Sequence, residues 1–197
     1  MVLLLAVFKP TDAVQGQTPF FDQLKQKFED GGVFVATFTH EYRDAYTHEE
    51  TMTEGKIWIS ANKYRVESEE QVMVVDGEIS RVYDAVRNRL LISEYEPEDD
   101  DFAPSRMLQG VDESYSVQEE ANPAGAVIVL KNDDPFAIFK VVNINLNSDG
   151  LPVSIEAVDQ ADNELITRFE NGSFMTDDPS LFEIDVPEET EQIDLRH

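Results

Sequence analysis

Metal binding is the first chemistry that the side chains of this 197-residue sequence suggest, because His40, Glu41, His48 and Glu49-Glu50 lie close together. On a strand, His40 and Glu41 would point to opposite faces, and His48 would lie beyond a turn at Asp44-Ala45. No third ligand follows at a recognisable spacing, and the chain has no HExxH motif. We therefore expect exposed hairpin residues here and no metal site.

The acidic run at residues 96–101 could bind Ca²⁺ weakly, but it lacks the alternating ligands and the glycine of an EF-hand loop. We interpret it as a solvated loop. No GxSxG, GxGxxG or Walker A motif is present, and no local motif links a Ser, a His and an Asp. Catalytic residues need not be neighbours in sequence, so an enzyme is not excluded on this ground. We expect a protein without enzymatic activity, metal or cofactor.

Charge and composition narrow the class of protein further. The chain carries 41 acidic and 15 basic residues, a formal net charge of −26, and has no cysteine. Nucleic-acid binding needs clustered Lys and Arg, so no nucleic-acid partner is expected, and anionic membrane surfaces are disfavoured too. The acid excess predicts either adaptation to high salt, which would screen the repulsion, or simply a solubilising surface. The length fits one domain, and we expect a monomer.

The amino terminus contains an apolar run at residues 2–8, too short to cross a bilayer. Small or neutral residues follow it, as after the h-region of a signal peptide, although a basic n-region is missing. We interpret residues 1–16 as a signal peptide and residues 17–197 as a single domain. The alternative is a first strand or a buried stub.

The elements that would position any site are a helix followed by many strands. Thr18-Pro19 begins a helix whose apolar stripe ends at Gly31-Gly32. The period then changes to two, as in strands. Alternation of this kind covers residues 34–39, 57–59, 64–66, 71–75, 79–85, 89–95, 114–120, 125–131, 138–147, 151–159 and 163–170. Hairpin signals lie at Asp76-Gly77, Asp149-Gly150, Asp162-Asn163 and Asn171-Gly172.

Strands joined by tight turns are antiparallel, so the pattern predicts a meander and not βαβ units. A short helix is expected within residues 102–109. A long antiparallel sheet with a leading helix and an inserted helix can bury its apolar face if the sheet curls and the helices cover its concave face. The fold class is therefore mainly β with α, a curved antiparallel β-barrel that is not closed.

Residues 55–92 carry a family resemblance. They contain Gly55-Lys56-Ile57-Trp58-Ile59, Lys63-Tyr64-Arg65-Val66-Glu67, the turn Asp76-Gly77 and Val82-Tyr83-Asp84. This order resembles the outer-membrane lipoprotein carrier protein family, LolA, with its Gly-x-Leu-Trp-Ile strand, Phe-Arg-Trp-type strand, Asp-Gly hairpin and Tyr-Asp strand. The earlier strand at residues 34–39, the late hairpin at 150–163 and the closing strand at 182–187 are similar to that family as well.

The resemblance implies a half-barrel whose N-terminal and short helices form a lid over an apolar cavity. It further implies a periplasmic carrier that binds acyl chains of lipoproteins and shuttles them from the inner to the outer membrane. Its partners would be acylated lipoproteins, an inner-membrane lipoprotein-releasing ABC transporter and an outer-membrane acceptor lipoprotein. An arginine that the family has between two strands, proposed to help hold the lid shut, is replaced here by the stretch Ser60-Ala61-Asn62-Lys63. The lid of this chain therefore lacks that arginine contact.

The expected lipid-binding residues fall into two groups. The cavity wall is predicted to contain Phe34, Phe38, Ile57, Ile59, Tyr64 and Val66, and the lid to contain Phe21, Leu24, Phe28, Met107 and Leu108. An ordinary packed core is the alternative for any such apolar stripe. Two other functions stay open: a lipid-sensing envelope regulatory domain on the same fold that binds a protein partner, and a hydrolase of acyl esters.

Overall fold

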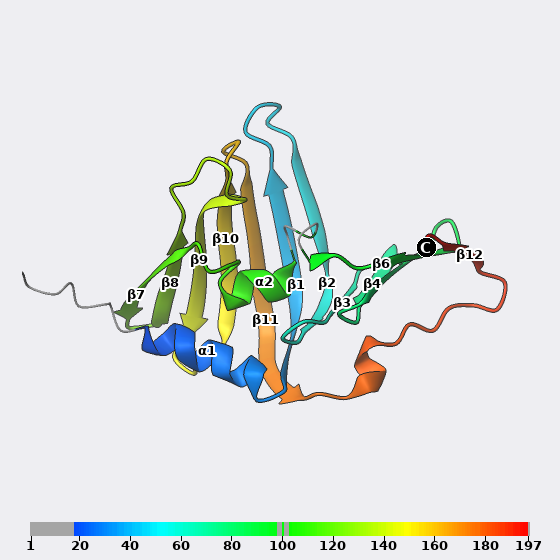
Figure 1. The fold of residues 1–197 in the computed structure, drawn as a ribbon, viewed down its shortest axis with the longest axis horizontal. Coiled ribbons are helices and arrows are strands. Elements are labelled where there is room, and N and C mark those ends of the chain that lie inside the picture. Colours follow the sequence, from blue (N-terminus) through cyan, green and yellow to red (C-terminus); the bar gives the residue numbers. More distant parts are fainter. Residues whose placement is uncertain (1–17, 98–99, 101–102, 197) are drawn as a thin grey trace, which may run out of the picture.

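The computed structural model describes residues 18–97, 100 and 103–196, and the predicted signal peptide at residues 1–16 lies outside them. Among the described residues, twelve strands form a single sheet (Figure 1). The strands are β1 (Gly32–Arg43), β2 (Glu50–Ile59), β3 (Tyr64–Glu67), β4 (Gln71–Val75), β5 (Ile79–Asp84), β6 (Arg89–Glu94), β7 (Ser116–Asn122), β8 (Gly125–Lys131), β9 (Phe139–Asn147), β10 (Pro152–Asp159), β11 (Glu164–Thr176) and β12 (Glu191–Asp194). The helices are α1 (Pro19–Glu29), α2 (Pro104–Gln109) and the 3₁₀ turn η2 (Pro179–Phe182).

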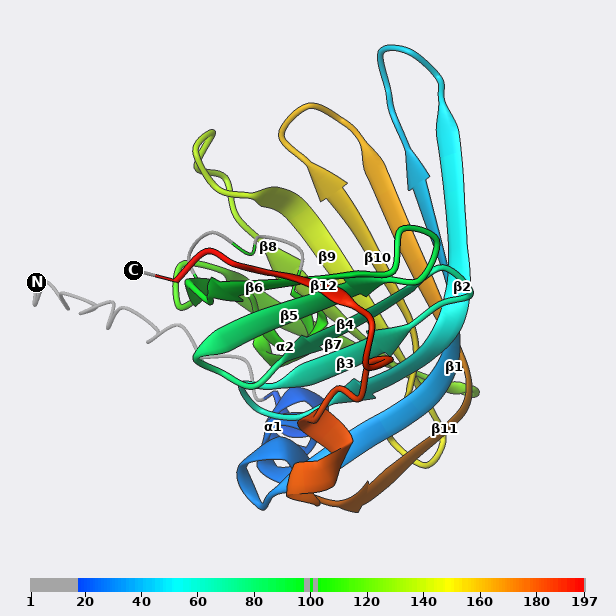
Figure 2. The same ribbon diagram turned by 90° about the vertical axis from the view of Figure 1, so that its right-hand side faces the viewer.

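The strand order is β12-β6-β5-β4-β3-β2-β1-β11-β10-β9-β8-β7, so β12 and β7 are the two edges and the sheet is not closed into a barrel. The sheet is strongly curved (Figure 2). All neighbouring strands are antiparallel except β12, which runs parallel to β6. The predicted mainly-β half-barrel with an N-terminal helix is confirmed. The purely antiparallel meander is wrong in two places, because β12 runs parallel to β6 and because β1 pairs with β11, which is not its neighbour in sequence.

The two α-helices, α1 and α2, pack on the concave face of the sheet (Figures 1 and 2). Pro19 occupies the first turn of α1, where its missing N–H costs nothing. The helix then buries Phe21, Leu24 and Phe28 against the sheet, and α2 adds Met107 and Leu108. Their burial removes apolar side chains from water and fixes the helices in place.

A second, smaller core lies on the convex face. Trp58 packs there against Val33, Val74 and Phe182, beneath the chain that follows β11. Trp58 thus lies on the face of β2 opposite to Ile57 and Ile59, which belong to the concave core. The closing segment at residues 182–187, in contrast, is not a strand: after η2 it runs extended over this face before β12 begins.

The Asn171-Gly172 signal does not form a hairpin, and this prediction is wrong. β11 continues through both residues, and its register against β1 shifts between the pairs Val35↔Ser173 and Thr37↔Glu170. Asn171 has a left-handed φ of 56°, so the extra residue is accommodated as a β-bulge. The bulge bends the longest strand of the sheet.

The sheet divides beside β2. This strand pairs with β1 along all ten of its residues but with β3 only from Lys56 to Ile59. A Cβ at Gly55 would lie 1.8 Å from the carbonyl oxygen of Glu67, where β3 ends, so only glycine fits at this junction. The part of β2 before Gly55 has no β3 partner, and together with the facing part of β1 it projects as a long hairpin (Figure 2).

Candidate functional site

An apolar pocket of about 220 Å³ lies on the concave face beneath α2. Its residues come from β1, β2, β3, β10, β11 and the helix, and eight of the eleven are apolar. They are Phe38, His40, Thr53, Ile57, Val66, Pro104, Met107, Ile155, Leu165, Thr167 and Phe169. This volume is below the range of about 300–1,000 Å³ that is usual for small-molecule sites. The pocket therefore has the right chemistry for a hydrocarbon chain but room for only part of a long one.

Strand register explains which side chains meet in this apolar pocket. Phe38 of β1 is opposite Phe169 of β11, so both rings lie on the same face of the sheet. Two residues further along β1, His40 is opposite Thr53 on one side and Thr167 on the other. The pocket thus changes from an aromatic row to a polar row across one step of the pleat.

The polar row is held by a hydrogen bond of 2.8 Å between His40 Nδ1 and Thr167 Oγ1. Burial of the ring lowers the pKa of His40, and the negative charge of the adjacent Glu41 opposes this shift in part. Glu41 points to the other face, where it forms an ion pair of 2.6 Å with Arg168. The imidazole is therefore uncharged at neutral pH and faces the pocket without a charged partner.

The predicted lipid-binding residues all lie on the concave side, but they divide into three sets. Four of them, Phe38, Ile57, Val66 and Met107, line the apolar pocket. Six others are buried in the packed core around it and do not border it: Phe21, Leu24, Phe28, Phe34, Ile59 and Leu108. These six pack between the helices and the sheet, in the core beside the pocket.

Tyr64 forms the third set, because its role is to hold the segment before α2. It packs against Ala103 and Val75, and its hydroxyl donates a hydrogen bond of 2.7 Å to Asp100. Burial, together with this hydrogen bond, raises the pKa of Tyr64, so the phenol stays protonated as a donor. Arg106 of α2 donates to the carbonyl oxygen of the same Asp100 at 3.2 Å.

A glutamine of α2 contacts the turn between β2 and β3, the turn in which the family pattern has an arginine. The amide nitrogen of Gln109 donates to the carbonyl oxygen of Ala61 at 2.6 Å and to that of Ser105 at 2.9 Å. Ala61 lies in the turn between β2 and β3, the stretch that replaces the family's arginine. The lid helix and the wall are therefore joined by an uncharged contact at this point.

Sequence reasoning missed seven of the pocket residues. These are His40, Thr53, Pro104, Ile155, Leu165, Thr167 and Phe169. The alternation in β10 and β11 marks Ile155, Leu165 and Phe169 as buried, but only the pairing of β11 with β1 places Phe169 opposite Phe38 and Leu165 opposite Tyr42. His40 was expected to be an exposed hairpin residue, and this is wrong because the hairpin begins further along, at Asp44.

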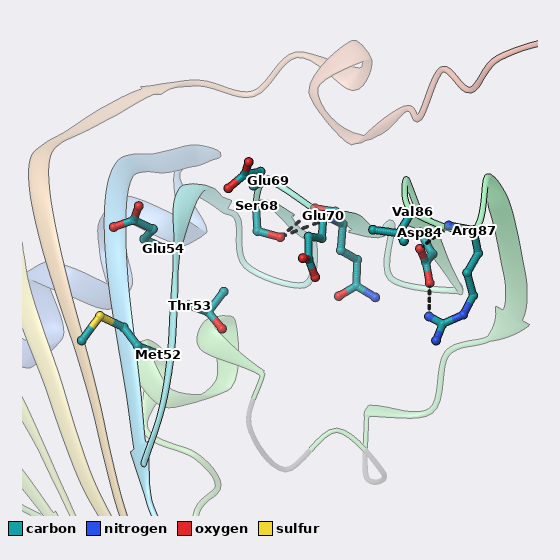
Figure 3. A pocket seen from close by; sticks show the side chains of 10 residues that line it. Met52, Thr53, Glu54, Ser68, Glu69, Glu70, Asp84, Val86 and Arg87 are labelled. Carbon is teal, nitrogen blue, oxygen red and sulfur yellow. Dashed lines mark hydrogen bonds and ion pairs between the residues drawn. The ribbon is translucent and has the colours of Figure 1, made fainter.

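A larger pocket of about 650 Å³ lies between the projecting half of β2 and the β3–β4 and β5–β6 turns (Figure 3). It is lined mainly by polar and charged groups, which include Glu54, Glu69, Glu70 and the Asp84–Arg87 ion pair of the β5–β6 turn. Thr53 borders both sites, so the polar row of the apolar pocket lies next to this polar pocket. A carboxylate-rich wall is unsuited to hydrocarbon, so the apolar pocket is the better candidate site.

Metal binding finds no support in the described part of the chain, where no three His, Asp or Glu side chains are grouped to hold an ion. None of the helices in residues 18–97, 100 and 103–196 is long and apolar enough to span a membrane.

Solved structures with a similar fold exist, although no protein-family model and no curated protein matches this sequence. A conserved protein from Thermus thermophilus is 13% identical, with a TM-score of 0.54 over 88% of this chain and 98% of that one. A LolA superfamily protein from Nitrosomonas europaea is 11% identical (TM-score 0.45; 83% and 97% covered). A domain from Vibrio parahaemolyticus assigned to outer-membrane lipoprotein sorting is 10% identical (TM-score 0.43; 83% and 94% covered).

At these identities the likeness concerns the fold. The chain has the open half-barrel fold of the Thermus thermophilus protein, with the apolar pocket on its concave face.

Proposed function

We propose that this protein is a carrier without enzymatic activity, which shields acyl chains from water in the apolar pocket. The observation that supports this most directly is the pocket itself, an aromatic and aliphatic hollow between the sheet and a short helix. Each CH₂ group kept from water contributes about 0.8 kcal/mol, so even part of an acyl chain would be bound with useful free energy.

The small volume of the apolar pocket sets a condition on this function. A full acyl chain needs more space than about 220 Å³, so α2 has to move away from the wall when a long chain enters. Pro104 and Met107 place α2 directly at the pocket, and methionine adapts easily to a new neighbour. Loading would then exchange the packing of α2 for contacts with the ligand.

The cargo in our proposal is acylated lipoproteins, which the protein would receive from an inner-membrane ABC transporter and deliver to an outer-membrane acceptor lipoprotein. The periplasm is the compartment that this route requires. The motif resemblance of residues 55–92 supports the proposal, and so does the physical need to cover several acyl chains in an aqueous space. Direction along the route would come from differing affinities at each step.

Native mass spectrometry of the protein isolated from the periplasm tests the proposal. We expect masses that correspond to bound acylated cargo. A Val66→Phe variant, which fills the apolar pocket, should lose this cargo. Val72→Phe is the matched control, because Val72 packs on the convex face and should not affect loading. Absence of acylated cargo from the wild-type protein, or equal loading of both variants, would contradict the proposal.

A lipid-sensing regulatory domain is the second candidate, and the size of the apolar pocket favours it, since one partly enclosed chain suffices for sensing. Such a domain would form a stable stoichiometric complex with a membrane regulator and would release no cargo to an acceptor. Co-purification of the regulator in place of lipoproteins would decide for this candidate.

A further inference from the structure

We propose that the apolar pocket selects acyl chains with an uncharged polar head, such as an ester or an amide, and rejects free fatty-acid carboxylates. The head would lie at the row formed by His40, Thr53 and Thr167. This inference rests on the proposed acyl-chain binding and adds the chemical class of the ligand.

The geometry gives the ligand an orientation. All three polar residues of the apolar pocket belong to a single row across β2, β1 and β11. The next row contains the facing pair Phe38 and Phe169. An acyl chain that binds here therefore places its tail on the aromatic row and its head on the polar row.

The charges around the polar row exclude an anionic head. Among the described residues, none of the eleven that line the apolar pocket is Lys or Arg. The nearest arginine along β11, Arg168, points to the opposite face and is paired with Glu41. A carboxylate in this position would be desolvated without a compensating cation, which weakens its binding.

The polar pocket next to Thr53 adds an electrostatic repulsion of an anionic head to this desolvation. It contains Glu54, Glu69 and Glu70, which have no ion-pair partner within the described ranges. An ester or amide head carries no charge, and its carbonyl oxygen accepts hydrogen bonds from hydroxyl or imidazole donors, the groups that the polar row offers.

The test compares two probes of equal chain length on the full chain at pH 8, 1-monolauroylglycerol and laurate. Each displaces the neutral fluorophore N-phenyl-1-naphthylamine, which reports binding without a charge of its own. We expect laurate to bind more weakly by about tenfold or more, since an uncompensated buried charge outweighs its small difference in size. Equal affinities, or tighter binding of laurate, would overturn the inference while leaving acyl-chain binding intact. Failure of both probes to bind would overturn the proposed function as well.

A pair of variants separates the polar row from the overall charge of the protein. His40→Lys places a cation in the row, and we expect it to raise the affinity for laurate relative to that for the glycerol ester by about tenfold. Thr39→Lys adds the same charge on the opposite face of β1 and should not alter the ratio of the two affinities. Equal effects of the two variants would mean that general electrostatics, and not this site, sets the preference.

Discussion

The carboxylate of Glu119 on β7 accepts a hydrogen bond of 2.6 Å from the backbone N–H of Phe21 in the first turn of α1. Its second oxygen accepts from the N–H of Phe20 at 3.1 Å. Thr18, the residue at the helix cap, makes no capping hydrogen bond with its side chain. A side chain from the edge of the sheet therefore caps the helix, and this joins the N-terminal end of α1 to the edge strand β7.

Replacement of Glu119 should loosen this joint. We expect Glu119→Ala to lower the free energy of unfolding by about 1–2 kcal/mol, because two N–H groups lose their acceptor and the helix dipole loses a favourable charge. Urea denaturation measures the change. Glu120→Ala is the control, since Glu120 is exposed and points to the other face, and an equal loss in both variants would contradict the capping role.

The hydrogen bond from Gln109 to Ala61 predicts how α2 is released. Gln109→Ala should speed amide hydrogen exchange in α2 and the entry of N-phenyl-1-naphthylamine, with a loss of about 1 kcal/mol in global stability. Gln23→Ala on the exposed side of α1 is the helix-sited control. Unchanged exchange in α2 would show that other contacts hold the helix.

Two neighbouring residues of α2 should respond differently to truncation. Leu108 is fully buried in the core, so Leu108→Ala should cost about 2–4 kcal/mol by leaving a cavity that cannot collapse. Met107 borders a space that is already open, so Met107→Ala should cost less but alter the affinity for 1-monolauroylglycerol. Chemical denaturation and probe displacement give the two quantities, and the reverse order of effects would contradict the placement of the pocket.

Acidification should destabilise the protein through His40. Because burial lowers the pKa of His40 in the folded protein, the unfolded chain binds a proton more readily than the folded one. The loss of stability begins as the pH falls below the unfolded value of about 6.5 and ends at the folded pKa. His40→Gln should show a smaller loss between pH 7.5 and pH 5.5 than the wild type.

The control for this pH effect is His48→Asn. His48 is exposed in the β1–β2 turn with a left-handed φ of 59°, which asparagine tolerates. This variant should keep the pH dependence of the wild type. A matching change in both variants would assign the effect to the loss of any histidine.

The acid excess predicts a response to salt. With a net charge of −26 and only 15 basic residues, most carboxylates repel one another across the surface. Raising KCl from 0.1 M to 1 M shortens the Debye length from about 10 Å to about 3 Å, so we expect the melting temperature to rise. A melting temperature that stays constant would indicate that the charge serves solubility alone.

Local patterns in the sequence predicted the elements well, because alternation and turn residues act over a few positions. The turns at Asp76-Gly77, Asp149-Gly150 and Asp162-Asn163 lie where they were expected. Asn171-Gly172 carries the same signal, yet the pairing of β11 with β1 continues through it as a bulge. Tertiary pairing decided between two local conformations that the dipeptide allows equally.

The candidate site depended on contacts between residues far apart in the chain. Phe38, Ile57, Val66 and Met107 were predicted from apolar phase, whereas Thr167 joined the site only through its register with His40. The cap of α1 is a similar case, since Thr18 fits the local rule and Glu119, 98 residues from Phe21, provides the acceptor. Periodicity shows which face a side chain takes but not which distant strand comes to lie beside it.

The short ladder between β2 and β3 has a mechanical consequence. Four residue pairs join the arm formed by β3 to β6 and β12 to the remainder of the wall, whereas ten pairs join β2 to β1. The β3–β4 ladder is equally short, with four pairs, so resistance to bending is lowest on the two sides of β3. The sheet can therefore open by a swing of this arm about β3, while the longer ladders between β2, β1 and β11 stay intact.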